Sequence, residues 1–204
     1  MRRNNTDMPV TLEMVKELRE TTGAGVLDCK KALESANGDM GRAQQILRDK
    51  GLAIAAKKAE RVVKDGLVES YVHMGKVGAL VELNCETDFV ARTPEFKALA
   101  HDLAMQVVAA HPQYIRSEDI PAEVLENEKR IYRAQMADQN KPAHVLERIV
   151  ENKLQNFYAE VCILNQPFIK NEDKTVQDVI NEKIATIGEN IVLRRFVRLE
   201  LGES

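Results

Sequence analysis

The sequence predicts an α+β protein, in which an amino-terminal unit of three helices precedes a core with a small antiparallel sheet packed on helices. Three observations predict this fold. Apolar side chains recur at helical spacing around glycine turns in residues 9–52. Residues 67–84 form two alternating runs joined by a Gly-Lys turn, as in a β-hairpin. A last alternating run at residues 191–201 predicts a strand that closes on this hairpin.

Composition limits the classes of protein that the chain can belong to. Of its 204 residues, 44% are hydrophobic and 30% are charged, which is too apolar for disorder and enough for one or two domains. The net charge is −3, whereas a nucleic-acid binder is usually basic, so we expect no direct contact with nucleic acid. No run approaches the ~18 apolar residues of a membrane span, and no secretory leader is recognisable. Three widely spaced cysteines favour a reducing cytoplasm.

The amino-terminal unit begins after a flexible arm at residues 1–8. Thr11 is the expected N-cap of the first helix, with apolar neighbours that form a hydrophobic staple. Residues 22–25, Thr-Gly-Ala-Gly, separate this helix from the second, and Asn37-Gly38 ends the second. The third helix is expected to end before Gly51.

A connector at residues 53–66 joins this unit to the core. It is helix-prone and locally basic, and Gly66 is expected to end it. A solvated, semi-rigid connector is favoured over a basic patch that binds phosphate, because charged runs usually form a solvated helix face.

The core, residues 67–204, follows the hairpin with several helices. The first is expected to start at Thr93-Pro94 and to end at His111-Pro112. Its apolar stripe is Phe96, Leu99, Ala100, Leu103, Ala104, Val107 and Val108. The remaining expected elements are helices at 121–138 and 143–158, a short strand at 161–164, a helix at 175–187 and the strand at 191–201.

The most informative segment is residues 84–92, Asn-Cys-Glu-Thr-Asp-Phe-Val-Ala-Arg. It places an aromatic ring beside an acid where a strand gives way to a helix, and such connections lie on the surface. Phe89 either folds back into the core or is kept for a partner's pocket. Thr87 and Asp88 either act on a partner or cap a helix.

The lack of catalytic and metal-binding motifs in the sequence favours a protein that is not an enzyme. The chain has no Cys-x-x-Cys, no His-Glu-x-x-His, no Gly-x-Ser-x-Gly and no phosphate-binding glycine loop, so no cofactor or metal is expected. Cys85 has no histidine near it in the sequence. A buried, small apolar side chain is a better interpretation of Cys85 than a nucleophile.

Three separated blocks resemble the bacterial elongation factor Ts family. The first comprises Lys-Glu-Leu-Arg at 16–19 and Thr-Gly-Ala-Gly-Val-Leu-Asp-Cys-Lys-Lys-Ala-Leu at 22–33. The second is the segment 84–92, with Thr-Asp-Phe-Val-Ala at its centre. The third is Ile-Gly-Glu-Asn-Ile at 187–191, followed by two arginines at 194–195. The three blocks occur in order and the resemblance spans nearly the whole chain.

The resemblance implies a guanine nucleotide exchange factor for elongation factor Tu in translation elongation. Residues 9–52 then resemble the family's ubiquitin-associated-like domain, which packs on the nucleotide-binding domain of the GTPase. Arg19, Val26 and Leu27 occupy the positions that imply partner contact. For Val26 and Leu27, core packing in the first turn of the second helix is the competing interpretation.

The second block implies the exchange mechanism. In the family, an Asp-Phe pair enters the nucleotide-binding domain of the partner, magnesium is displaced and GDP leaves. Asp88 and Phe89 carry this role by resemblance, with Thr87 and Val90 beside them. Burying one Phe side chain in a partner contributes roughly 1.5–3 kcal/mol of binding free energy. An extended interface has to supply the rest of the free energy needed to release GDP.

The chain resembles the short form of the family, with one core module where longer forms have two related halves. A second copy is a candidate for the missing half, which makes a homodimer possible. The terminal strand could pair across a two-fold axis or within one chain. Two alternative functions remain open: an adaptor whose helical unit binds nascent chains or RNA, and a hydrolase that uses Cys85.

Overall fold

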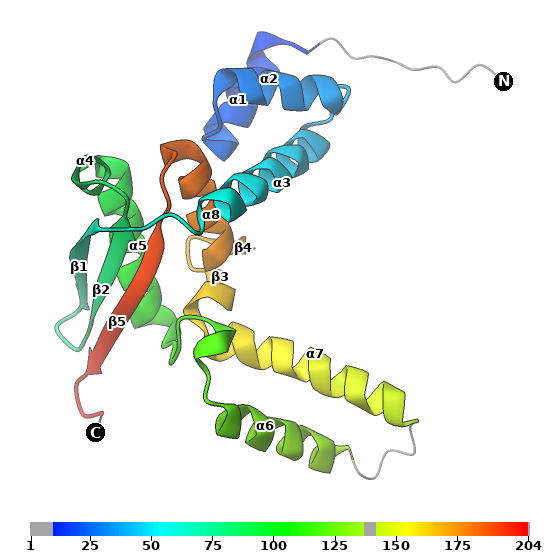
Figure 1. Cartoon of the computed structure of the whole chain (residues 1–204), viewed down its shortest axis with the longest axis vertical. Helices are drawn as coiled ribbons and strands as arrows, with labels where there is room; N and C mark the ends of the chain where they lie inside the picture. The colour runs from blue at the N-terminus through cyan, green and yellow to red at the C-terminus, as the bar shows by residue number, and fades with distance from the viewer. Residues whose placement is uncertain (1–9, 137–141, 204) are drawn as a thin grey trace.

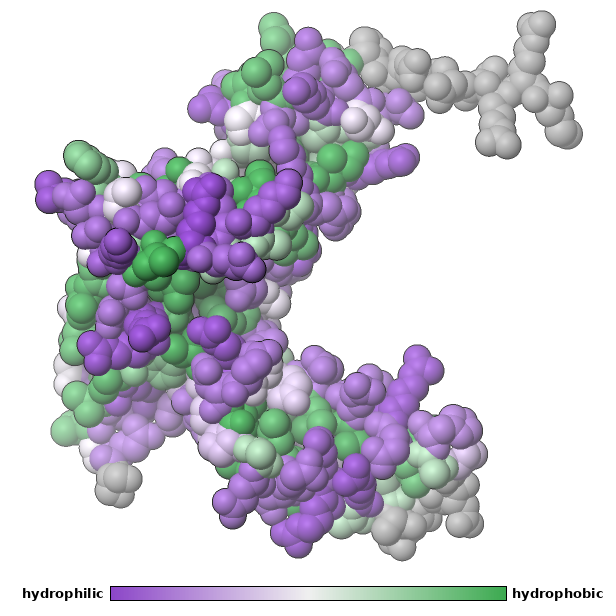
Figure 2. All heavy atoms as spheres, in the orientation of Figure 1, coloured by the Kyte–Doolittle hydropathy of each residue, from purple (hydrophilic) through white to green (hydrophobic). Residues whose placement is uncertain are grey.

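A computed structural model describes residues 10–136 and 142–203 and confirms the predicted α+β class. The expected arm at residues 1–8 lies outside the described residues. Figure 1 shows three parts: the amino-terminal helices, a sheet with the helices that cover it, and a projecting pair of helices. In this view the first and third parts project on the same side, so the space-filling outline in Figure 2 is C-shaped.

The amino-terminal part contains helices α1 (Leu12–Thr22), α2 (Val26–Ser35) and α3 (Met40–Lys58). Thr11 caps α1 as predicted, since its hydroxyl accepts a hydrogen bond from the Met14 amide at 3.2 Å. Gly23 adopts the left-handed conformation that ends α1, with φ of 67°. The small core of this part is centred on Leu18, Cys29 and Leu33, which are fully buried.

Helix α3 differs from the prediction. It continues through Gly51 to Lys58, so the expected end before Gly51 is wrong. Residues 53–58 of the expected connector are helical, as predicted, but they continue α3, and the helix ends before Gly66. A Cβ atom at Gly51 would lie 3.7 Å from the Cβ of Ala185 on helix α8 (Val176–Ile187). A methyl group here would make an ordinary van der Waals contact, so a small residue suits the place where the two helices pack. Only residues 59–64 lie outside regular structure between α3 and the sheet.

The sheet has three antiparallel strands in the order β1-β2-β5. The predicted hairpin is confirmed as β1 (Asp65–His73) and β2 (Val77–Cys85), and the predicted final strand as β5 (Val192–Glu200). Strand β5 pairs with β2, with a register shift at Glu82/Leu83. Pairing within one chain therefore accounts for the inner edge of β5.

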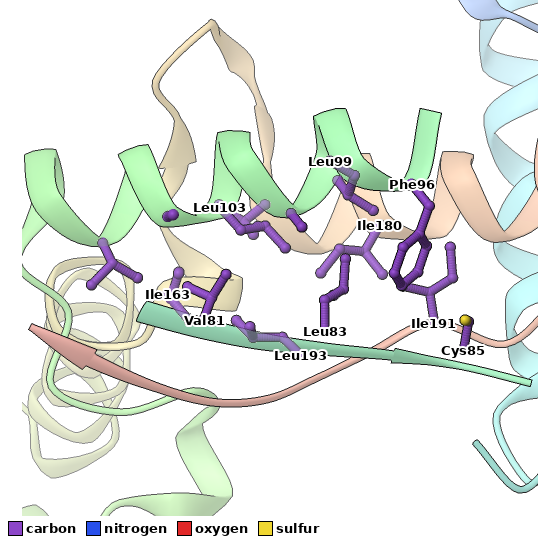
Figure 3. Packing of buried hydrophobic residues seen from close by; sticks show 14 of the residues in the cluster. Val81, Leu83, Cys85, Phe96, Leu99, Leu103, Ile163, Ile180, Ile191 and Leu193 are labelled. Carbon is purple, nitrogen blue, oxygen red and sulfur yellow. The ribbon is translucent and has the colours of Figure 1, made fainter. Parts of the chain in front are cut away.

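One face of the sheet is covered by helix α5 (Pro94–Ala110), the helix predicted from the Thr93-Pro94 signal, with α8 beside it. Figure 3 shows Phe96, Leu99 and Leu103 of α5 directed at the side chains of β2 and β5. The residues that they meet are Val81, Leu83 and Leu193. All six side chains are at most 2% exposed, so these contacts form the main core.

The opposite face of the sheet is left uncovered by the described residues. Aliphatic side chains from all three strands share this face and are each more than half exposed: Val68 and Val72 on β1, Leu80 on β2, and Val197 and Leu199 on β5. The register places Leu80 directly beside Val197. A continuous exposed apolar surface of this kind is typical of an interface.

The projecting part is a helical hairpin of α6 (Ala122–Gln135) and α7 (Ala143–Val161), close to the predicted helices. The predicted strand at 161–164 is wrong. Residues 163–165 instead form a short 3-10 helix after α7, and Cys162 makes only an isolated bridge with Tyr114. Val161, Cys162 and Ile163 are buried, and Leu164 is partly buried against the main core.

Three small elements complete the described fold. A 3-10 helix lies at Ser117–Asp119, and a second small hairpin pairs β3 (Pro167–Phe168) with β4 (Asn171–Thr175). Helix α8 begins with the predicted Thr175 cap, which forms a capping box with Asp178. Among the described helices, none has the length and apolar character needed to cross a membrane.

Candidate functional site

The segment 84–92 folds as a tight turn that ends β2 and begins a helix of one turn, α4 (Asp88–Ala91). The Thr87 hydroxyl accepts a hydrogen bond from the Val90 amide at 3.5 Å, which caps α4. Ala91 is buried against the core and anchors the short helix. The capping role considered for Thr87 is thus realised.

Phe89 points into solvent with 78% of its surface exposed. The two neighbouring side chains make contacts within the chain. Val90 is half-buried against the main core, and the Asp88 carboxylate accepts a hydrogen bond from Arg92 at 2.6 Å. The ring is therefore not part of the core. Of the two orientations considered for Phe89, the structure has the outward one.

A second segment, distant in sequence, fastens this turn. The Glu189 carboxylate accepts hydrogen bonds from the backbone amides of Glu86 and Thr87, both at 3.0 Å, and from the Thr87 hydroxyl at 2.6 Å. In return, the Glu86 carboxylate accepts the Asn190 amide at 2.7 Å. The second and third sequence blocks therefore meet directly.

Sequence reasoning did not assign Glu189 a role. The available signal was its position immediately after Gly188, the left-handed residue that ends α8. The end of a rigid helix fixes the direction in which the next side chain leaves the backbone. Nothing in the sequence identified its hydrogen-bond donors, which lie about one hundred residues earlier in the chain.

The helical unit exposes the other residues expected at the partner interface. Val26 is 54% exposed and Leu27 is 72% exposed, both in the first turn of α2, and Arg19 is exposed in the last turn of α1. Core packing of Val26 and Leu27 is therefore wrong, because Cys29 and Leu33 fill that role in α2. These residues do not join Phe89 in one cluster: α2 and α4 lie in separate parts of the molecule (Figure 1).

Cys85 has the environment of a structural residue. It is fully buried, and its thiol donates a hydrogen bond to the Thr87 carbonyl at 3.1 Å. Burial, reinforced by the negative charge of Glu189, raises the pKa of the Cys85 thiol to about 11. A protonated, inaccessible thiol is a poor nucleophile, which counts against the hydrolase hypothesis.

Metal chemistry has no obvious centre in the described part of the chain. Within residues 10–136 and 142–203, no three His, Cys, Asp or Glu side chains are grouped so that they could hold an ion. Exposed apolar side chains are found instead at Phe89 beside the turn, at Val26 and Leu27 in α2, and on the uncovered face of the sheet.

Comparison with known proteins identifies the family. The family model described as Elongation factor TS matches residues 40–203. A protein named Elongation factor Ts from Carboxydothermus hydrogenoformans is 62% identical over 195 residues, which are 95% of this chain and 90% of the relative. The Elongation factor Ts of Thermodesulfovibrio yellowstonii is 57% identical over 97% of this chain and 98% of the relative. The chain belongs to the elongation factor Ts family.

Proposed function

We propose that this chain is a guanine nucleotide exchange factor that binds elongation factor Tu and promotes GDP release during translation elongation, in the cytoplasm. Family membership supports the partner, and the observation that carries the proposal is the outward Phe89 ring on a fastened turn. The adaptor alternative gains no support, since the relatives named above are elongation factors.

In the proposed mechanism, Phe89 enters the nucleotide-binding domain of the partner beside the magnesium and phosphate site. Asp88 accompanies it, and Thr87 and Val90 keep the turn in shape. Displacing magnesium removes positive charge that neutralises the phosphates, so GDP binds less tightly. The Asp88–Arg92 pair is exposed, so releasing Asp88 to contact a partner costs little, about 0.5 kcal/mol.

The energy of one ring is too small to expel the nucleotide alone. Burying a Phe side chain contributes roughly 1.5–3 kcal/mol, whereas nanomolar nucleotide binding corresponds to about 12 kcal/mol. The second contact, through Arg19, Val26 and Leu27, lies on separate helices and adds further binding energy. Exchange requires that the whole interface bind the nucleotide-free partner better than the GDP-bound one.

A second copy of this chain is the proposed occupant of the uncovered sheet face. The aliphatic residues on this face are neighbours across three strands, and a two-fold axis would bring the same patch of both copies together. Sedimentation equilibrium should give the mass of a dimer, and Leu80→Asp should give a monomer. Val62→Asp, at an exposed apolar position outside the sheet, is the control. A monomeric wild-type chain would contradict this assembly.

The exchange function is tested by stopped-flow release of a fluorescent GDP analogue from elongation factor Tu. We expect the chain to accelerate release, and the acceleration to shrink as free magnesium is raised, because the chain and the ion compete. Release at the spontaneous rate would contradict the exchange function. Acceleration independent of magnesium would retain the exchange function and reject magnesium displacement.

A further inference from the structure

We propose that Glu189 is a positioning residue, which orders the turn that presents Phe89 to the partner. The role in exchange rests on the proposed function, whereas the ordering of the turn does not. Glu189 lies outside the residues expected to touch the partner, and it acts through the backbone of Glu86 and Thr87.

The geometry around Glu189 is that of a clamp. A carboxylate offers about four acceptor positions, and three of them are occupied here, by two backbone amides and the Thr87 hydroxyl. The same hydroxyl accepts the Val90 amide, so the clamp and the cap of α4 share one oxygen atom. Moving the turn would break all of these bonds together.

The clamp is itself anchored on both sides. Glu189 follows Gly188, whose amide donates to Ile184 at the end of α8. Its neighbour Asn190 is buried and donates from its side chain to the carbonyls of Ala59 and Arg61, at 3.3 and 2.9 Å. The turn is thus joined to the end of α8 and to the segment that follows α3.

Such a clamp matters because Phe89 makes few contacts of its own. Because most of the Phe89 side chain lies in solvent, the direction of the ring is set by its own backbone, which follows Thr87 by two residues. Ordering a mobile side chain at an interface costs about 0.5–1.5 kcal/mol, and a turn ordered before binding avoids that cost. Loss of the clamp should therefore slow exchange by about two- to tenfold.

Glu189→Gln is the informative variant, because the size is kept while one acceptor oxygen becomes an NH₂ donor. The matched control is Glu182→Gln, which changes a partly buried carboxylate within α8 that pairs with Lys174 at 2.8 Å. Thr87→Val, which removes one donor from the other side of the clamp, provides a second variant in case Glu189→Gln does not fold.

The chain has no tryptophan, so Phe89→Trp creates a single tryptophan at the exposed position, whose fluorescence is excited at wavelengths that the four tyrosines do not absorb. We expect Glu189→Gln to lower the fluorescence anisotropy of this reporter in the full chain, and Glu182→Gln to leave it unchanged. A role confined to global stability would not change the anisotropy of a chain that remains folded. Equal anisotropy with and without the Glu189 substitution would overturn the proposal.

Nucleotide release gives the second readout. In the wild-type background Glu189→Gln should slow exchange about two- to tenfold, and in a Phe89→Ala background it should have no further effect, since the ring it positions is gone. The same factor in both backgrounds would overturn the positioning role. If the parent chain does not accelerate release at all, the exchange function fails, while the anisotropy result still decides whether Glu189 orders the turn.

Discussion

Replacing Phe89 with alanine should separate binding from folding. Because 78% of the side chain is exposed, only about a fifth of the roughly 1.5–3 kcal/mol available from burying a Phe contributes to the fold of the free chain. We therefore expect Phe89→Ala to lower the free energy of unfolding by about 0.3–0.7 kcal/mol. Urea denaturation followed by circular dichroism measures this change.

The exposed fraction sets the effect on exchange. If the partner buries the remaining 78%, the lost free energy is about 1.2–2.3 kcal/mol, which is a factor of about 7 to 50 in the efficiency of GDP release. Stopped-flow release over a range of chain concentrations measures it. Met74→Ala, at an exposed apolar position in the turn of the β1–β2 hairpin, is the control. Wild-type efficiency in a folded Phe89→Ala chain would refute the role of the ring.

Three further outcomes are expected. Leu27→Asp should weaken the affinity for elongation factor Tu about tenfold while the melting temperature changes little, because the side chain is exposed; unchanged affinity in a titration would remove α2 from the interface. Gly51→Ala should stabilise the chain by up to about 1 kcal/mol, whereas Gly51→Leu should cost about 1–3 kcal/mol by separating α3 from α8; equal urea midpoints would contradict this packing. Because the pKa of Cys85 is raised, its contribution to stability should be complete below pH 9 and be lost as the pH rises to about 11; Cys85→Ala should flatten this part of the stability profile, and an unchanged slope would refute it.

Periodicity predicted the larger elements because their burial repeats along the sequence. The alternation in β2 places Ala79, Val81 and Leu83 inward, as expected, and the stripe of α5 is buried along its length. The N-caps of two helices could also be predicted, because the Thr11 and Thr175 hydroxyls accept hydrogen bonds from amides only three residues away. These signals are local, so one sequence is enough to read them.

The errors arose where tertiary contacts override a local signal. Gly51 is read as a helix end, yet the close approach of α8 makes a small residue favourable inside α3. Residues 161–164 are apolar because they pack into two hydrophobic clusters, although they form no extended strand. The β3–β4 hairpin was missed because β3 is only two residues long.

The candidate site shows the same division. The exposed setting of Phe89 was one of two orientations that the sequence allowed, and only the structure distinguishes them. The role of Glu189 depends on a contact between residues about one hundred positions apart. No spacing rule within a single element can predict such a contact.

In the proposed mechanism the chain stabilises the nucleotide-free state of elongation factor Tu. Calorimetric titration of the chain against nucleotide-free and GDP-bound elongation factor Tu compares the two affinities. We expect the nucleotide-free form to bind on the order of a hundredfold more tightly, since exchange can arise only from differential affinity. Equal affinities for the two forms would contradict it.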